Sequence, residues 1–258
     1  MGSALRCRNA SIAAADFWVV AGGFLALWKQ AGGTFTGATR EGVTPASARL
    51  VGTHRSPVLS DIVRDINKFS NNVMARNLFL TIGAATGKPP ATPVKSSQAI
   101  TAFLHRSALP MAGLYLDNGS GLSRDEHVTA QSLADMLVAA NSSPVAQVFV
   151  ESLPIAGVDG TMAHRLNNAG ALGNAHIKTG TLRDVRAIAG YVASADGNSY
   201  VVVSLINDPH SEAARAAHDA LLEWVYQGPS QGFTKVSDPV AEPRVSKPRK
   251  NPHKRGTH

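Results

Sequence analysis

The feature that most constrains the fold is a change of pattern near residue 175. Three segments beyond it, residues 175–181, 185–194 and 199–206, are rich in Val, Ile, Ala and Tyr, which is typical of strands. Ala195-Asp196-Gly197-Asn198 joins the last two, and an Asp-Gly pair in this position favours a β-hairpin. An amphipathic stretch over 212–226 predicts a closing helix. The chain should therefore have a mixed α/β fold with antiparallel strands.

The residues before this point predict mainly helices. A stripe at helical spacing follows Ser56-Pro57, which is a suitable helix start, and it ends at Ser70-Asn71-Asn72. A second apolar set begins at Val73, so we expect a helix, a polar break and another helix. Further helices are expected after Ser96 or Ser97, after Thr129 and over 144–153. Residues 34–55 suggest short strands or loops.

The amino-terminal residues 1–23 form an apolar segment whose run continues to Trp28. Arg6 and Arg8 precede the run as they would in a secretory signal. Asp16 interrupts the run, Gly22-Gly23 weakens a central helix, and no small-x-small cleavage site follows. We therefore expect a core helix rather than an export signal or a membrane span, and we keep the signal or anchor as the alternative.

The carboxyl-terminal residues 229–258 differ from the rest in composition. Residues 227–258 hold seven Lys or Arg against two acidic residues, and so five of the net seven positive charges of the 258-residue chain. The stretch also holds five of the fourteen prolines. It is predicted to be a disordered basic tail that attracts anionic polymers without specificity. Because the rest of the chain shows no basic stripe, a dedicated nucleic-acid binder is the weakest of the functions considered.

Cofactor and metal sites are poorly supported by the sequence. The single cysteine, Cys7, excludes an internal disulfide framework and a cysteine-rich zinc site. The nine histidines show no ligand spacing, and neither a phosphate-binding loop nor a dinucleotide fingerprint occurs. We expect neither a metal nor a cofactor.

Two short polar elements carry the chemistry. One is Ser70-Asn71-Asn72 between two predicted helices, and the other is His176-Ile177-Lys178-Thr179-Gly180-Thr181-Leu182 on the first predicted strand. Either element alone is commonly a helix cap or a turn. Their order and contexts together match the motif set of penicillin-binding proteins and class A β-lactamases.

Residues of about 25–226 resemble D-alanyl-D-alanine carboxypeptidase/endopeptidases of the low-molecular-mass penicillin-binding type. The resemblance is carried by residues 56–72, by Asp117-Asn118-Gly119-Ser120-Gly121-Leu122-Ser123-Arg124, by Gly157-Val158-Asp159-Gly160-Thr161 and by Lys178-Thr179-Gly180-Thr181-Leu182, which follow in the family's order. It implies a penicillin-binding/β-lactamase-like fold, with residues 24–228 as the carboxyl-terminal part of the domain. The family sheet has five strands, two of which would come before the matched region. One sheet edge would then lack its partners, and we expect marginal stability without a high, cooperative melting transition.

The resemblance assigns substrate binding to the first predicted strand. Lys178 would offer its charge to the terminal carboxylate of the peptide, and the Thr179 hydroxyl would donate to the same carboxylate. Gly180 would let the substrate backbone lie close to the strand, and the Thr181 backbone N–H would be an oxyanion donor.

The resemblance also implies roles for Ser70 and Asn72. Ser70 would relay a proton to the leaving amine, and Asn72 would hold the substrate amide and the lysine beside the nucleophile. The family's nucleophile lies in a Ser-x-x-Lys motif upstream of the matched segments, and no serine of this sequence, including Ser120 and Ser123, has Lys three residues later. Asp117 and Asp159 are expected to shape loops.

Two functions stay open at this point. In the first, the chain belongs to a serine-type carboxypeptidase that forms an acyl-serine on peptidoglycan stem peptides ending in D-Ala-D-Ala, and that also binds β-lactams. In the second, it is a non-catalytic remnant or binding module that keeps the carboxylate site. The resemblance places either one in the periplasm or cell envelope.

Overall fold

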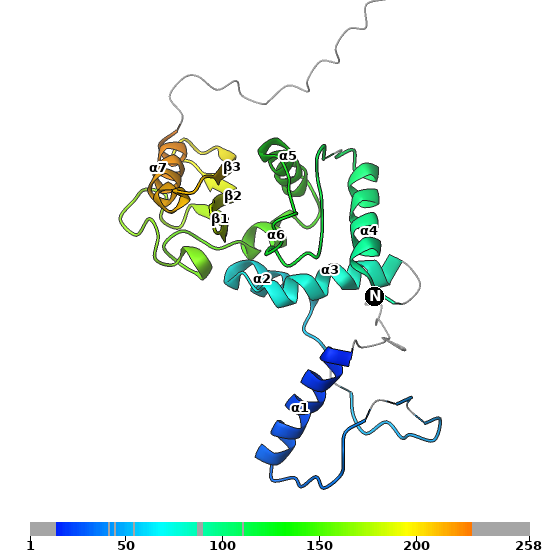
Figure 1. Cartoon of the computed structure of the whole chain (residues 1–258). Helices are drawn as coiled ribbons and strands as arrows, with labels where there is room; N and C mark the ends of the chain where they lie inside the picture. Colours follow the sequence, from blue (N-terminus) through cyan, green and yellow to red (C-terminus); the bar gives the residue numbers. More distant parts are fainter. Residues whose placement is uncertain are drawn as a thin grey trace, which may run out of the picture. The chain divides into compact units, whose positions relative to one another are not determined.

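The computed structural model describes residues 14–40, 42–43, 45–53, 55–86, 90–109 and 111–228. The chain divides into two units, Met1–Gly228 and Pro229–His258, and the second lies outside the described residues, as does the predicted disordered tail. The element order of the first unit is α1 (Ala14–Gln30), α2 (Leu59–Phe69), α3 (Asn72–Thr86), α4 (Pro93–Arg106), α5 (Ala130–Asn141), α6 (Ala146–Ser152), η1 (Gly160–Met162), β1 (Ala175–Leu182), β2 (Val185–Ala193), β3 (Ser199–Asn207), η2 (Ser211–Ala213) and α7 (Ala214–Gln227) (Figure 1).

The three strands form one antiparallel sheet in the order β1-β2-β3. Lys178 of β1 lies opposite Ala189 of β2, and Gly190 of β2 lies opposite Val202 of β3. The predicted mixed fold with an antiparallel sheet flanked by helices is confirmed, and the strand ends differ from expectation by one residue at most. Because both connections are hairpins, register follows from local turns.

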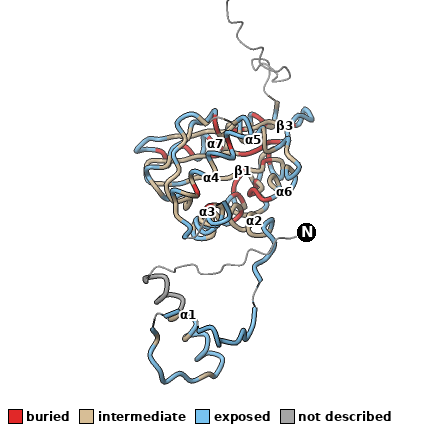
Figure 2. The backbone as a smooth tube through the Cα atoms, turned by 90° about the vertical axis from the view of Figure 1, so that its right-hand side faces the viewer, coloured by how far each residue is buried: buried red, intermediate tan, exposed pale blue. Residues whose placement is uncertain are grey.

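Side chains alternate between the two faces of the sheet, as the period of a strand requires. On one face, Ile188, Val192 and Val202 pack with Leu222 and Val225 of α7 in the larger core cluster. The opposite face packs against α5 and α6 through a second cluster of Leu137, Leu153 and Tyr191, joined by Ala189, Val201 and Val203. Buried residues are concentrated where the sheet meets these helices (Figure 2).

This alternation decides where Lys178 points. Lys178 is opposite Ala189, which belongs to the face that packs against α5 and α6. α2 packs against α6 and against η1, so it lies on the same side. The side chain of Lys178 is therefore directed toward the end of α2.

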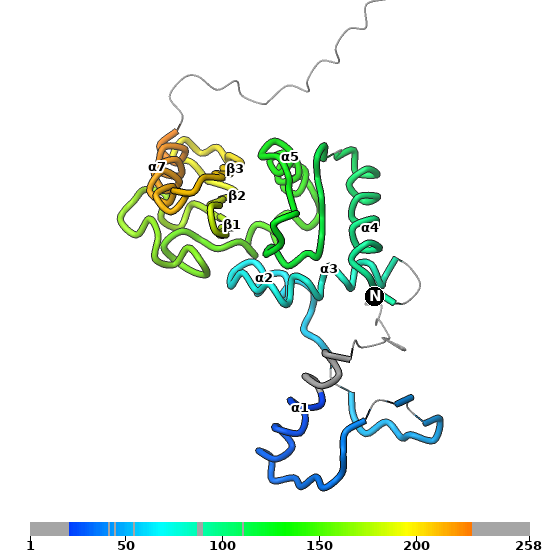
Figure 3. The backbone as a smooth tube through the Cα atoms, viewed as in Figure 1, coloured from blue at the N-terminus to red at the C-terminus, as the bar shows by residue number. Residues whose placement is uncertain are grey.

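The predicted polar break between two helices is present. α2 ends at Phe69, Ser70 takes a left-handed conformation with φ 51° and ψ 47°, and α3 begins at Asn72. The Ser70 N–H donates to the Ile66 carbonyl, which closes the helix end. The chain passes from α2 into α3 without a long loop (Figure 3).

Two of the expected helix starts are wrong. α2 begins at Leu59 and not at Ser56-Pro57, and its N-cap, Val58, makes no side-chain cap bond. α4 is capped by Thr92, which accepts from the Lys95 N–H at 3.3 Å, because Pro93 suits the first helical position. Ser96 lies inside that helix, fully buried. The predicted cap at Thr129 is confirmed by its bond from the Ser132 N–H at 3.1 Å.

The amino-terminal apolar run is helical over α1, but the expectation of a core helix is wrong for its described side chains. Phe24 and Leu27 are 63% and 67% exposed. Phe24 stacks on Trp28 of the next turn, with ring centroids 6.2 Å apart, so the aromatic contact is made within the helix itself. No helix among the described residues combines the length and apolarity needed to cross a membrane. Residues 34–55 form no strand where they are described.

The backbone groups along β1 divide between the two edges of that strand. The Ile177 N–H donates to the Pro154 carbonyl and the Ala175 carbonyl accepts from the Ala156 N–H, so odd-numbered residues of β1 face away from β2. By the same alternation, Val201, Val203 and Leu205 of β3 turn their backbone groups away from β2. Within the described part of the chain, these outward groups of β3 have no backbone partner.

Candidate functional site

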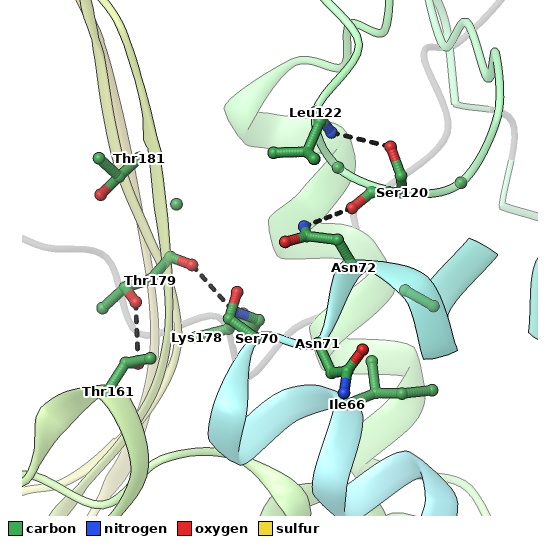
Figure 4. Close-up of a pocket in the computed structure, with 14 residues that line it drawn as sticks. Ile66, Ser70, Asn71, Asn72, Ser120, Leu122, Thr161, Lys178, Thr179 and Thr181 are labelled. Carbon is green, nitrogen blue, oxygen red and sulfur yellow. Dashed lines mark hydrogen bonds between the residues drawn. The ribbon is translucent and has the colours of Figure 1, made fainter. Parts of the chain in front are cut away.

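A groove of about 450 Å³ lies between the α2–α3 junction and β1. The junction contributes Ser70, Asn71 and Asn72, and the strand contributes residues 178–181. The loop of residues 119–122 and Thr161 complete the lining. Figure 4 shows the strand residues on one side and the junction on the other, with the side chains of Lys178 and Ser70 meeting between them.

Lys178 spans the groove. Its Nζ donates to the Ser70 Oγ at 2.9 Å and to the Thr179 carbonyl at 2.9 Å, although Ser70 and Lys178 are 108 residues apart in sequence. An ammonium has three N–H donors, so one is left for a ligand. Among the described residues no carboxylate pairs with Lys178. The groove therefore holds a positive charge that the fold does not neutralise.

Burial changes the acid–base behaviour of this lysine. Lys178 is partly buried, and desolvation lowers its pKa below 10.5 because the charged form loses hydration. The same desolvation strengthens attraction to an anion in the groove compared with bulk water. Lys178 is consequently suited both to bind a carboxylate and to exchange a proton with Ser70.

The outer edge of β1 lies open along the groove. Odd-numbered residues of this strand face outward, so the N–H groups of Thr179 and Thr181 point away from β2, and both residues line the groove. An extended peptide placed along this edge would find backbone donors at two-residue intervals.

Asn72 is oriented by the opposite wall. Its Nδ2 donates to the Ser120 carbonyl at 2.6 Å, which leaves its Oδ1 as the acceptor on the groove side (Figure 4). The loop that carries Ser120 is held by Glu126, whose Oε1 accepts from the backbone N–H groups of residues 117, 118 and 119 at 2.9–3.1 Å. The loop thus fixes both the position and the orientation of the Asn72 amide.

All six residues assigned from the sequence lie along this one groove: Ser70, Asn72, Lys178, Thr179, Gly180 and Thr181. Their chemical roles remain predictions. Of the serines rejected as nucleophiles, Ser120 contributes to the groove lining and Ser123 does not. In the described part of the chain, no three His, Cys, Asp or Glu side chains gather in a way that could hold a metal ion.

Sequence reasoning missed two contributors. Thr161 Oγ1 and Thr179 Oγ1 lie 2.9 Å apart, within hydrogen-bond distance, so the 3₁₀ turn orients a groove hydroxyl. Glu126 acts through the backbone of the 117–119 loop, and nothing in its sequence context distinguishes it from an ordinary surface acid. Thr161 is the last residue of Gly157-Val158-Asp159-Gly160-Thr161, a segment that carried the family resemblance, and that segment was the available signal.

Comparison with known proteins gives a consistent picture. A model of the D-Ala-D-Ala carboxypeptidase 3 (S13) family matches residues 4–227. A D-alanyl-D-alanine carboxypeptidase from an Actinomadura species is 38% identical over 202 residues, which are 74% of this chain and 36% of that protein. D-alanyl-D-alanine carboxypeptidase DacB of Haemophilus influenzae is 31% identical over 183 residues, covering 69% of this chain and 38% of that one.

The fold comparison agrees. The crystal structure of penicillin-binding protein 4 (dacB) from Haemophilus influenzae, in complex with a β-lactam, superposes with a TM-score of 0.67 and 25% identity. The match covers 81% of this chain and 52% of that chain. This chain therefore spans little more than a third of the length of the curated relatives that it matches.

Proposed function

The chain belongs to the D-Ala-D-Ala carboxypeptidase 3 (S13) family, and from this premise we propose that its groove binds the D-Ala-D-Ala end of peptidoglycan stem peptides for serine-type hydrolysis. The observation that carries the proposal is the 2.9 Å bond between Lys178 Nζ and Ser70 Oγ, in a groove without a paired carboxylate among the described residues. Such a site favours a ligand that brings its own negative charge. The proposal places its work in the cell envelope, where peptidoglycan lies.

In this proposal the peptide lies along the outer edge of β1. The free carboxylate of the last D-alanine accepts from the Lys178 ammonium and the Thr179 hydroxyl. The carbonyl of the penultimate D-alanine then accepts from the outward Thr181 N–H, which stabilises the negative charge that develops there; the loss of one such donor costs roughly 10²–10³ in rate. Gly180, which has no side chain, lets the substrate backbone lie close to the strand between Thr179 and Thr181.

The chemical step that we propose has two stages. A serine hydroxyl attacks the penultimate carbonyl, an ester bond forms, and the C–N bond to the last D-alanine breaks. The proton of the attacking hydroxyl reaches the leaving amine through the hydrogen-bonded pair of Ser70 and Lys178. Water then hydrolyses the ester, releases the shortened peptide and restores the serine.

The attacking serine is a separate part of the proposal. No serine in these 258 residues is followed three positions later by lysine, which is the spacing of the family's nucleophile motif. We assign the acylating serine to a part of the catalytic domain other than these residues. This assignment favours a second candidate function for the chain on its own, which is a peptide-binding module without acylation.

Two measurements test the proposal. A diacylated lysyl-D-Ala-D-Ala should bind reversibly in a calorimetric or NMR titration, and the same peptide with an amidated carboxyl terminus should bind at least about tenfold more weakly, since a hydrogen bond to a charged group contributes about 1.5–3 kcal/mol. Equal binding of acid and amide would overturn the carboxylate site.

A fluorescent penicillin separates the two candidate functions. If the acylating serine lies outside these residues, the chain alone should show no covalent band. A band that disappears when the protein is denatured beforehand would show that the chain acylates by itself, and it would overturn our assignment of the nucleophile.

We expect peptide binding to depend on pH in the alkaline range. The ammonium form of Lys178 holds the carboxylate, and its pKa is lowered by burial. As pH rises through that lowered pKa, Lys178 loses its charge, so affinity for the acid peptide should fall at a pH below 10.5, where an ordinary lysine is still charged. Titrations between pH 7 and 10 with the amidated peptide as control should show the fall only for the acid. A flat profile for the acid would contradict this assignment.

A further inference from the structure

One buried charge lies beside the groove without lining it. Lys68, in the last turn of α2, is only 7% exposed and stands two residues before Ser70. Its Nζ donates to the Leu153 carbonyl at 2.6 Å and to the two carboxylate oxygens of Asp159 at 2.9 and 2.7 Å. All three donors of the ammonium are used, so this lysine has no capacity left for a ligand.

The loop that carries Asp159 is attached to β1, which forms the other wall of the groove. Asp159 Oδ1 also accepts from the Ile155 N–H at 2.8 Å. Immediately before Ile155, the Pro154 carbonyl accepts from the Ile177 N–H of β1 at 2.7 Å. The strand residue held in this way directly precedes Lys178, so a continuous set of bonds joins the end of α2 to the groove strand.

The loop makes a second connection just after Asp159. Thr161 Oγ1 lies 2.9 Å from Thr179 Oγ1. Gly160, the residue between Asp159 and Thr161, lies against the end of α2. A Cβ at Gly160, whose φ is +57°, would lie 2.6 Å from the Lys68 carbonyl. Contact this close requires glycine, and it leaves little room for the loop to shift along the helix.

We propose that the ion pair of Lys68 and Asp159 is a positioning device that sets the separation of Ser70 and Lys178. Each of these groove residues belongs to a different wall, and Lys68 links the walls at a point two residues from Ser70. Neither Lys68 nor Asp159 touches substrate; both act through the residues that they place. The inference deepens the proposed function and depends on it only for the peptide measurement below.

The test compares Lys68→Met, which keeps the aliphatic length and removes the charge, with Asp61→Asn. Asp61 pairs with Arg64 on the same helix at 3.3 Å, and these two side chains are 44% and 54% exposed, so the pair is a matched surface control. A hydrogen bond to a charged group contributes roughly tenfold or more to affinity, and a displaced Lys178 would lose most of it. Lys68→Met should therefore weaken binding of the acid peptide by about tenfold or more, and Asp61→Asn should leave it unchanged.

A second measurement does not require any ligand. The titration of Lys178, followed by NMR of labelled lysine side chains, should move upward toward 10.5 in both Lys68→Met and Asp159→Asn because a loosened groove admits water. The altered charge alone would move the pKa of Lys178 upward in Lys68→Met and downward in Asp159→Asn. The upward shift in both variants would be seen even if the peptide failed to bind the wild-type chain, so failure of the proposed function and failure of this inference are distinguishable.

Two outcomes would show that the ion pair of Lys68 and Asp159 does not position the groove. If Lys68→Met melts at a lower temperature but keeps the wild-type titration of Lys178, the ion pair serves stability alone. If Lys68→Met does not fold, Asp159→Asn keeps an oxygen acceptor for the Ile155 N–H, and the same measurements apply to it. Failure of both variants to fold, with Asp61→Asn folded, would assign the pair to the core of the fold and would also overturn the proposal.

Discussion

Gly190→Ala is expected to unfold the sheet that carries the groove strand. A Cβ at Gly190 would lie 2.0 Å from the His176 carbonyl oxygen and 3.0 Å from the Ile177 Cα, both backbone atoms of β1. Backbone atoms in a paired strand cannot move aside as a flexible side chain can, so the two strands must separate. We expect the free energy of unfolding to fall by at least about 3 kcal/mol. This is the upper end of the usual cost of overpacking and a large share of the stability of a typical domain. Urea unfolding followed by circular dichroism measures it.

Gly180→Ala is the matched control on the same strand pair. A Cβ there would meet only the Ala187 side chain, at 3.2 Å. The variant should keep the sheet and lose peptide affinity, because the methyl group occupies the edge where the substrate backbone is proposed to lie. A Gly190→Ala protein with the wild-type urea midpoint would show that the strands pair differently from the register described here.

Lys178→Met should remove the preference of the groove for a free carboxylate. The charged donor contributes about 1.5–3 kcal/mol to such a bond, so affinity for the acid peptide should fall by roughly 10- to 150-fold and approach that of the amide. Stability should be maintained, since Lys178 has no carboxylate partner among the described residues and methionine removes a desolvated charge. Calorimetric titration with both peptides measures the difference.

Lys178→Arg provides the charge control. It keeps a positive group that stays protonated throughout the alkaline range, so it should retain part of the acid preference and lose the alkaline fall in affinity. An unchanged acid preference in Lys178→Met would mean that another group binds the carboxylate.

The sequence predicted the sheet well because its signals are local. The strands around Lys178 carry β-branched residues, and Asp196-Gly197 forms the hairpin turn between β2 and β3, with Gly197 at φ +83°. The break at Ser70 was likewise visible, because three polar residues interrupted an apolar stripe. The start of α4 was predicted wrongly because Ser96 suits a cap by residue type, whereas in the structure Thr92 caps the helix and Ser96 is buried inside it.

The sequence predicted the residues of the candidate site but not the residues that hold them in place. Ser70 and Lys178 belong to recognisable motifs, and the groove places them together. Lys68 and Glu126 are charged residues of the kind that usually face solvent, and only their partners reveal what they hold. The exposure of Phe24 in α1 could not be foreseen either, because an apolar period indicates a helix without saying what covers it.

The outward backbone of β3 has a consequence for how the chain behaves in heavy water. The amides of Val202, Ser204 and Ile206 face β2, whereas those of Val201, Val203 and Leu205 face away from it and find no backbone acceptor in the described part of the chain. Deuterium should therefore enter this strand at every second residue, with slow and fast sites alternating. A further strand that paired with this edge of β3 would slow exchange at the fast sites, and the alternation would disappear.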